Sequence, residues 1–417
     1  MTLLLPPDSL VIQATGVMDM QLGQFFPKDE YEARWRRVEA EMARRGIERA
    51  VVLGRSGGTN DRCGDVLYLS NFFSTASGQG YDSQLFEGRS FNAVILRKGE
   101  TPELVADEPG LRASLISTDR IRSSNRPFRE IVKALNEGGG QGPIALVGSD
   151  MLPLRYWNIM KEEGPKIDWR IEDDLILSIR RIKSAREQDA LRIAGETATR
   201  ALNRMMEALI AGRPEAEAAS FAAQEVVRSG GNIHMLPIGH GDMIDLFVRN
   251  PIAGYTFDTP REGDLVRGWV YGPFFEGYYI DPGRTTVCGG KPSPEQKEMV
   301  ETGARIVEAI IEQIKPGRKV KEVALHGRAL CAQYGAVSNQ MAEKWPHFGH
   351  GIGLFFEKPY IGPEMCSDDD IFEDGMALGV EAFFGRPGLG SAGFEQNLLV
   401  TKEGTELLIK TPMIFWD

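Results

Sequence analysis

The sequence predicts an α+β protein of two domains, an α/β domain over residues 1–175 and a second domain of helices and strands over residues 176–417. Three observations predict this organisation. With 417 residues, 42% of them hydrophobic, the chain is globular in composition and too long for one ordinary core. Helix and strand patterns alternate from about residue 30 to about residue 170. A capping box at Ser184 and Glu187 then marks the boundary, because it opens a long new helix.

The first domain is expected to begin with an amphipathic helix at residues 30–46, which ends at Gly46 and is followed by a buried strand at residues 49–55. Further strands are predicted at residues 91–96, 102–105 and 143–148. Residues 54–89 are rich in Gly, Ser, Asn and Asp around one apolar block. This composition is typical of a surface loop, or of a loop that reaches a neighbouring active site.

The second domain is expected to open with the helix from Ser184 to Gly212. More helices are predicted at residues 215–229, 294–314 and 320–333. Apolar, β-rich runs indicate strands at residues 263–271, 277–281, 376–384 and 394–401. Each of the last three runs carries an acid within it or at its end, and this pattern is the strongest functional signal in the chain.

The composition limits which binding partners and which cellular compartment are expected for this protein. The formal net charge of -11 argues against nucleic acid or an anionic membrane and favours a small-molecule substrate. The four cysteines form no CxxC pair, which is typical of reduced thiols in a cytoplasmic protein. The sequence has no apolar run long enough to cross a membrane and no export signal at its beginning, so we expect a cytoplasmic protein without a membrane partner.

Three acids in apolar strands, Asp281, Glu381 and Glu395, require an explanation, because a buried carboxylate is costly unless it is paired or bound to a cation. A structural alternative is that each faces solvent or pairs with an arginine such as Arg284. The stretch PHFGHGIGL adds His350, whose flanking glycines indicate a crowded site. In the same stretch, His347 is expected to be a surface histidine rather than a hydrogen-bonding neighbour of the site.

Four motifs stand in order in the second domain: GYYIDPGRT at residues 277–285, FGHGIGL at 348–354, VE at 380–381 and FEQNLLVT at 394–401. They resemble the ordered motifs of the creatinase/methionine aminopeptidase superfamily, the peptidase M24 group. The resemblance implies a catalytic domain with the pita-bread fold at residues 176–417. It also implies that residues 1–175 form the N-terminal α/β domain of the creatinase and prolidase branches.

Metal-dependent members of that group hold two divalent ions with two aspartates, one histidine and two glutamates. The resemblance matches the metal ligands to Asp281, His350, Glu381 and Glu395. The first aspartate has no match, since Trp269 and Val270 stand where it is expected. The resemblance therefore implies one divalent ion, which can be manganese, iron, cobalt or zinc, and leaves open a site without metal.

Two further positions depart from the peptidases of the group. Glu357 stands where they carry a second histidine, and either Arg249 or His240 stands where many relatives carry a substrate histidine. The candidate catalytic residues are His350, Glu357, Glu381 and His240. The candidate substrate-binding residues are Arg249, Tyr278, Arg284 and Arg89.

These departures favour a non-peptidase hydrolase that cleaves a C–N bond of a small amidine, lactam or amide-like metabolite. Three alternatives stay open: an Xaa-Pro dipeptidase or aminopeptidase, a lyase acting on a small substrate, and a binding protein without turnover. The resemblance also implies a homodimer in which the loop at residues 54–89 approaches the partner's site, with Arg89 or Tyr81 as contacts.

Overall fold

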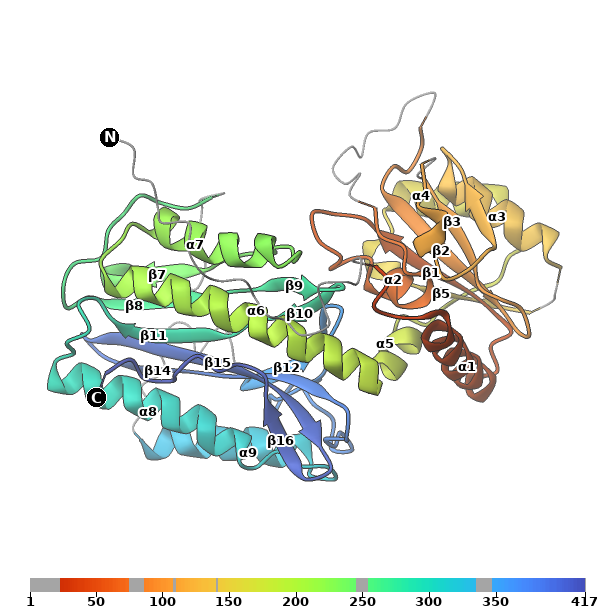
Figure 1. Cartoon of the computed structure of the whole chain (residues 1–417). Helices are drawn as coiled ribbons and strands as arrows, with labels where there is room; N and C mark the ends of the chain where they lie inside the picture. Colours follow the sequence, from red (N-terminus) through yellow and green to blue (C-terminus); the bar gives the residue numbers. More distant parts are fainter. Residues whose placement is uncertain are drawn as a thin grey trace, which may run out of the picture.

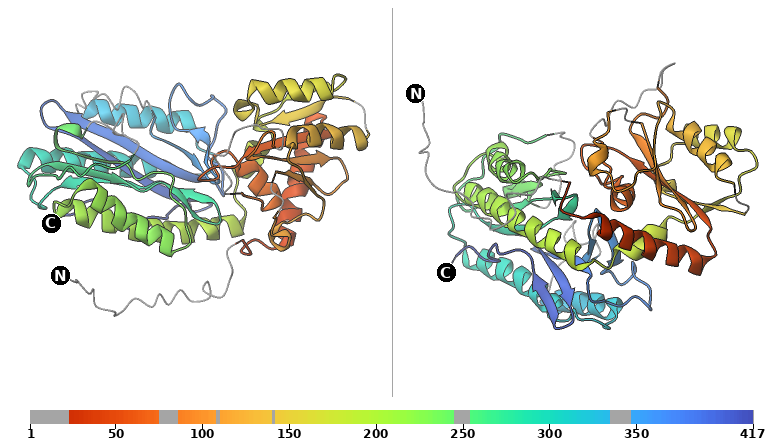
Figure 2. Two further views of the ribbon diagram at one scale, coloured as in Figure 1. Left: turned by 90° about the horizontal axis from the view of Figure 1, so that it is seen from above. Right: turned by 45° about the vertical axis from the view of Figure 1, so that its right-hand side comes forward.

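The computed structural model describes residues 23–74, 86–107, 110–139, 142–244, 254–334 and 347–416. The described residues form two large β-sheets and one two-stranded ribbon. The first large sheet lies within residues 49–171 and the second within residues 238–407. Figures 1 and 2 show the two halves side by side, connected through helix α5 and the beginning of the long helix α6. These helices span Asp174–Arg180 and Ala185–Ile210.

The N-terminal half is a mixed sheet in the order β4-β3-β2-β1-β5-β6, with helices on both faces. Its strands are β1 (Arg49–Arg55), β2 (Phe91–Arg97), β3 (Glu103–Ala106), β4 (Ile121–Ser123), β5 (Ile144–Val147) and β6 (Trp169–Ile171). Its helices are α1 (Lys28–Arg45), α2 (Gly64–Ser70), α3 (Pro127–Glu137) and α4 (Leu154–Glu163).

Strand β1 explains why both faces of this sheet are covered. Ala50 and Val52 belong to the core that includes α1 and α2, whereas Val51 and Leu53 belong to the core that includes α3 and α4. Successive side chains of a strand point to opposite faces, so a continuous apolar run such as β1 needs a helix layer on each side. The α/β architecture predicted for this half is confirmed.

The C-terminal half is built on a second sheet in the order β13-β12-β14-β15-β11-β8-β7, with β16 paired to β15. Helices α6 and α7 pack near the β7 to β11 side, α8 packs on β14 and β15, and α9 packs beside α8 (Figure 1). The helices after α6 are α7 (Glu215–Arg228), α8 (Pro294–Ile311) and α9 (Val320–Gln333). The strands are β7 (Ile238–His240), β8 (Leu265–Trp269), β9 (Gly272–Phe275), β10 (Tyr278–Ile280), β11 (Gly283–Val287), β12 (Gly349–Ile352), β13 (Phe356–Tyr360), β14 (Ala377–Arg386), β15 (Gly390–Thr401) and β16 (Gly404–Leu407).

The capping box at the junction is present as predicted. The Ser184 hydroxyl accepts a hydrogen bond from the backbone amide of Glu187, and the Glu187 carboxylate accepts one from the backbone amide of Ser184. Apolar residues of α1, α2 and α6 belong to one continuous core. The exact division at residue 175 stays a prediction, because side chains pack without interruption across it.

Two expectations from composition can be compared with the fold. Within the described ranges, no helix is both long and apolar enough to cross a membrane. The four cysteines are free thiols, and Cys63 and Cys288 are buried. One expectation fails in part: the apolar block inside residues 54–89 is not a loop, because residues 64–70 fold into α2 and bury its apolar side chains.

Candidate active site

Four chemically active side chains converge from three strands of the large sheet and from the end of the two-stranded ribbon. Asp281 directly follows β10, and His350, Glu381 and Glu395 lie on β12, β14 and β15. Glu381 stands directly opposite Glu395 in the antiparallel pair, so both carboxylates project from the same face. All four side chains are buried. The strands therefore hold the group on a rigid frame.

Strand β12 approaches β14 closely because of Gly349. This residue has a φ of 138°, and a Cβ placed on it would lie only 2.1 Å from the carbonyl oxygen of Gly379. No other amino acid fits this conformation and this spacing. The close approach brings the imidazole of the next residue, His350, to the carboxylates, as the glycine-rich stretch predicted.

His350 is oriented as a ligand. Its Nδ1 lies 3.1 Å from the carbonyl oxygen of Gly351, which can only accept, so Nδ1 carries the proton and the lone pair of Nε2 faces the acids. Nε2 lies 3.4 Å from Oδ2 of Asp281, 3.8 Å from Oε1 of Glu395 and 4.0 Å from Oε1 of Glu381. One ligand atom each from Asp281, His350 and Glu395 can be chosen so that all lie within 4.8 Å of one another.

The electrostatics of the group favour a bound cation. Burial raises the pKa of Glu395 well above its ordinary value, and the charges of Asp281 and Glu381 raise it further. Its Oε1 atom is buried and accepts no hydrogen bond within the described part of the chain. Carboxylate oxygens around one imidazole nitrogen form a donor set that suits manganese, iron, cobalt or zinc. The residues present therefore fit a divalent ion.

Trp269 stands where the resemblance leads one to expect the first metal-binding aspartate, which this sequence lacks. Its indole Nε1–H donates a hydrogen bond of 2.7 Å to Oε2 of Glu395, and its ring stacks on Phe383. Trp269 pairs with Gly283, where an added Cβ would lie 1.8 Å from the indole. Because an indole N–H only donates, this position supplies no metal ligand. The donor set of the described residues is thus that of one ion.

The fold and the site can now be compared with known proteins. A family model described as metallopeptidase family M24 matches residues 189–402. The chain belongs to family M24. A probable dipeptidase PepE of Mycobacterium tuberculosis is 30% identical over 268 residues, which are 64% of this chain and 68% of that protein. An Xaa-Pro dipeptidase of Pyrococcus horikoshii is 28% identical over 328 residues, 76% of this chain and 86% of that protein.

Solved structures of the family share the fold. The Xaa-Pro dipeptidase of Bacillus anthracis superposes with a TM-score of 0.75 at 22% identity and covers 93% of this chain and 99% of its own. PepE of Mycobacterium ulcerans gives a TM-score of 0.72 at 25% identity, over 94% of this chain and 98% of its own. The pita-bread architecture, membership in a hydrolase family and a divalent metal cofactor, all predicted from the motifs, are confirmed.

The predicted activity needs correction. A non-peptidase hydrolase was expected from the missing peptidase groups, but relatives of higher identity than the creatinase carry the names dipeptidase and Xaa-Pro dipeptidase. A creatinase of a Bacillus species is more distant, at 23% identity over 93% of this chain and 92% of that protein. Missing side chains at single positions are weaker guides to activity than similarity over the whole domain.

Glu357 does not face the candidate metal ligands. The ring of the preceding residue, Phe356, lies 4.1 Å from the His350 ring, and neighbouring side chains of a strand point in opposite directions. Glu357 is buried on the other side, where it contacts Nζ of Lys183 at 2.7 Å and Nε of Arg180 at 3.2 Å. The predicted role of Glu357 as a proton carrier is therefore corrected: it joins β13 to the junction between the two halves.

Tyr278 and Arg284 also have structural roles in place of the predicted substrate contacts. The Tyr278 hydroxyl donates to Glu187 at 2.7 Å and accepts from Arg34 at 3.3 Å. The Arg284 guanidinium is fully buried and donates to four backbone carbonyls, those of Gly283, Glu395, Thr411 and Pro412. Neither side chain keeps a group directed at a substrate.

His240 lies on the wrong face of the sheet for the catalytic role that was predicted. It pairs with Val266, on the same face as Gly268, whose Cα packs on methionines of α6. Its Nε2 lies 3.4 Å from Glu215 of α7. Since the metal ligands occupy the opposite face, His240 belongs to the packing of helix on sheet.

Two predicted substrate contacts cannot be placed at this site. Arg249 falls outside the described residues, as does Tyr81. Arg89 lies in the N-terminal half, where its Nε is 3.7 Å from Asp107 and its guanidinium covers the ring of Phe86. A contact between Arg89 and a partner subunit stays a prediction.

His347 was expected at the surface but is buried beside the metal ligands. Its Nδ1 accepts a hydrogen bond from the backbone amide of Gly349 and lies 3.5 Å from Oε1 of Glu381. Burial and the neighbouring His350 lower the pKa of His347 to about 4, so its ring is neutral near pH 7. The signal that could have placed it is its position three residues before His350, at the entry to the same strand.

An aromatic wall beside His350 was also missed. It consists of five rings contributed by three separate segments: His234, Tyr271, Tyr279, Phe355 and Phe356. A loop of the N-terminal half closes over it, since the Thr59 hydroxyl lies 3.1 Å from Nδ1 of His234 and Asn60 donates to the carbonyls of Gly277 and Leu354. Aromatic residues scattered along the sequence carry no spacing that predicts such a wall.

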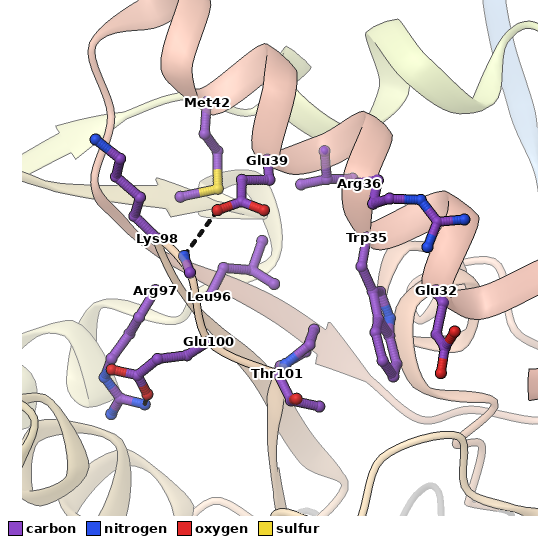
Figure 3. A pocket seen from close by; sticks show the side chains of 13 residues that line it. Glu32, Trp35, Arg36, Glu39, Met42, Leu96, Arg97, Lys98, Glu100 and Thr101 are labelled. Atoms are coloured by element: carbon purple, nitrogen blue, oxygen red, sulfur yellow. Dashed lines mark hydrogen bonds and ion pairs between the residues drawn. The ribbon is translucent and has the colours of Figure 1, made fainter. Parts of the chain in front are cut away.

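A separate surface pocket lies in the N-terminal half and has no part in this site. Figure 3 shows it between α1 and the turn that joins β2 to β3, where the Gly99 amide donates to Glu39. Its lining mixes acids, bases and a tryptophan, among them Glu32, Trp35 and Lys98. None of the metal-ligand candidates lines it, so we assign it no chemical role.

Proposed function

We propose that this chain is a metal-dependent peptidase that hydrolyses small peptides, with Xaa-Pro dipeptides as the main substrate class. The observation that carries the proposal is the buried group of Asp281, His350 and Glu395, with Glu381 beside it. Support comes from relatives of similar length that are named dipeptidase and Xaa-Pro dipeptidase.

In the proposed mechanism, Asp281, His350 and Glu395 would hold one divalent ion, and Glu381 lies beside these three residues. Such an ion, when bound, polarises a peptide carbonyl and makes water more acidic. Glu381 accepts the proton of the attacking water as the oxygen bonds to the carbonyl carbon. The C–N bond then breaks, and Glu381 returns the proton to the leaving nitrogen. His347 is buried beside this carboxylate, with its Nδ1 3.5 Å from Oε1 of Glu381.

The surroundings of the group support a small substrate. The aromatic wall borders His350 through Phe356, and the loop at residues 56–61 covers its outer end. Apolar walls exclude bulk water, which strengthens the interaction of a bound carbonyl with charged groups. Deep burial of the group favours a small substrate such as a dipeptide over a large folded protein.

Assembly and compartment form a second part of the proposal. We propose a homodimer in the cytoplasm, with the loop at residues 54–89 and Arg89 near the partner's site. The four free thiols are compatible with a reducing compartment. Light scattering of the purified protein measures the assembly directly, and a monomer at micromolar concentration would exclude the dimer.

The activity is tested with protein purified without chelator and then loaded with manganese or cobalt. We expect cleavage of Leu-Pro or Met-Pro to free amino acids, detected by mass spectrometry, and slower cleavage of Leu-Ala. The variant Glu395→Gln should lose metal and activity together, while Asp189→Asn, which changes an exposed helix residue, should keep both. If the loaded parent cleaves neither Xaa-Pro dipeptides nor Leu-Ala, the proposal fails.

A further inference from the structure

Tyr271 stands directly opposite the metal-ligand candidate Asp281. The antiparallel register pairs Ile280 with Gly272 on one side of this position and Gly283 with Trp269 on the other. The same register therefore places Tyr271 across from Asp281. Directly opposed residues of an antiparallel pair project from the same face. The phenol thus stands on the face that carries the metal ligands.

The ring of Tyr271 is held firmly by its aromatic neighbours. It stacks on Phe356 with ring centres 5.2 Å apart, and it contacts Tyr279 at 5.2 Å and His234 at 4.8 Å. Phe356 in turn contacts the ring of His350. A side chain packed on three sides has little rotational freedom, so the direction of its hydroxyl is set before any ligand binds.

The Tyr271 hydroxyl is the feature that calls for an explanation. The residue is only 5% exposed, and its hydroxyl has no hydrogen-bond partner within the residues that the structure describes. Burying an unpaired hydroxyl is unfavourable, and such a group in a native site commonly serves a ligand. A tyrosine hydroxyl is protonated near neutral pH and can therefore donate a hydrogen bond to such a ligand.

We propose that the Tyr271 hydroxyl donates a hydrogen bond to the oxygen that a bound ligand presents beside Asp281. In the peptidase reaction of the preceding subsection, on which this part rests, that oxygen is the carbonyl oxygen of the scissile bond. The donor is needed because Glu357 points away from the site and Phe356, which does face it, has no polar atom. Tyr271 then stabilises the negative charge that develops on the oxygen during attack.

The first test removes only the hydroxyl, in Tyr271→Phe. Loss of one such donor typically lowers kcat by about 100-fold or more, with KM changed by less than about threefold. The control Tyr156→Phe removes a hydroxyl from an equally buried tyrosine in the N-terminal half and should leave kcat unchanged. Metal content and thermal unfolding of each variant show whether the fold and the ion are retained.

The second test does not depend on peptidase activity. Azide is titrated into the cobalt-loaded protein and its affinity is measured from the visible absorption of cobalt. A hydrogen bond to a charged group predicts that azide binds about 10- to 100-fold more weakly to Tyr271→Phe than to the parent or to Tyr156→Phe. Equal affinities would overturn the proposal, even if kcat falls. Weaker azide binding in a parent that cleaves no peptide would retain Tyr271 as the donor and reject only the proposed peptidase function.

Discussion

The indole Nε1–H of Trp269 donates a hydrogen bond of 2.7 Å to one carboxylate oxygen of Glu395. The other oxygen of the same carboxylate accepts no hydrogen bond from the described residues and lies 3.8 Å from Nε2 of His350. One carboxylate is thus shared between an aromatic donor and the metal site. A second ion on the side of Trp269 would have to compete with an N–H group that points at its ligand.

This relationship predicts the metal content. The parent protein, loaded with manganese and passed over a desalting column, should retain about one equivalent by elemental analysis, the capacity of one set of ligands. His350→Ala should retain none, because the imidazole supplies the nitrogen ligand. Trp269→Phe should match the parent, because phenylalanine removes the N–H group but supplies no ligand for a second ion.

Trp157→Phe is the matched control for general effects of losing an indole, since Trp157 lies in the N-terminal half. Retention of about two equivalents by the parent would show that further ligands exist and that the single-ion interpretation is wrong.

Glu357 is predicted to stabilise the fold and not to take part in catalysis. In Glu357→Gln, the buried ammonium of Lys183 loses its charged partner. The guanidinium of Arg180 loses part of its charged contacts. Removing one partner of a buried ion pair typically costs about 3–5 kcal/mol of the free energy of unfolding. Denaturant titration measures the loss. We expect metal content to stay at the level of the parent.

Asp189→Asn breaks the exposed pair with Arg192 and should cost less than about 1 kcal/mol. A Glu357→Gln variant as stable as the parent but with strongly reduced kcat would restore the catalytic role that the sequence favoured.

The carboxylate of Glu103 is predicted to make stability depend on pH. Burial raises the pKa of Glu103, but hydrogen bonds from Arg122 at 2.6 Å and Arg97 at 2.8 Å outweigh it and leave the pKa below its ordinary value. A carboxyl with a lowered pKa in the folded state stabilises the protein above its unfolded pKa of about 4.3, and this stabilisation is lost as the pH falls through the folded value.

Urea unfolding of the parent and Glu103→Gln should therefore differ most near neutral pH and progressively less as the pH is lowered to about 3. Glu403→Gln, at an exposed turn, should follow the parent at every pH. A difference between parent and Glu103→Gln that stays constant over this range would contradict the assignment.

Local patterns predicted much of the fold. Helices α1, α6, α7, α8 and α9 follow from their apolar spacing and their end signals. The capping box of Ser184 and Glu187 is a contact between residues close in sequence, so its geometry is set by the local chain. Helix α2 was not predicted, since a short apolar block between polar loops has no periodicity that separates helix from strand.

The sequence by itself singled out the candidate metal ligands, because acids in apolar strands need a cation or a base and the ordered motifs resemble those of the M24 group. Asp281, His350, Glu381 and Glu395 do come together. Only the tertiary structure decided which way other side chains point. Strand register turns Glu357 to Lys183 and brings Tyr271 opposite Asp281. A shift of one residue in register moves every side chain of a strand to the other face. The order of residues in the sequence does not show which register the strands adopt.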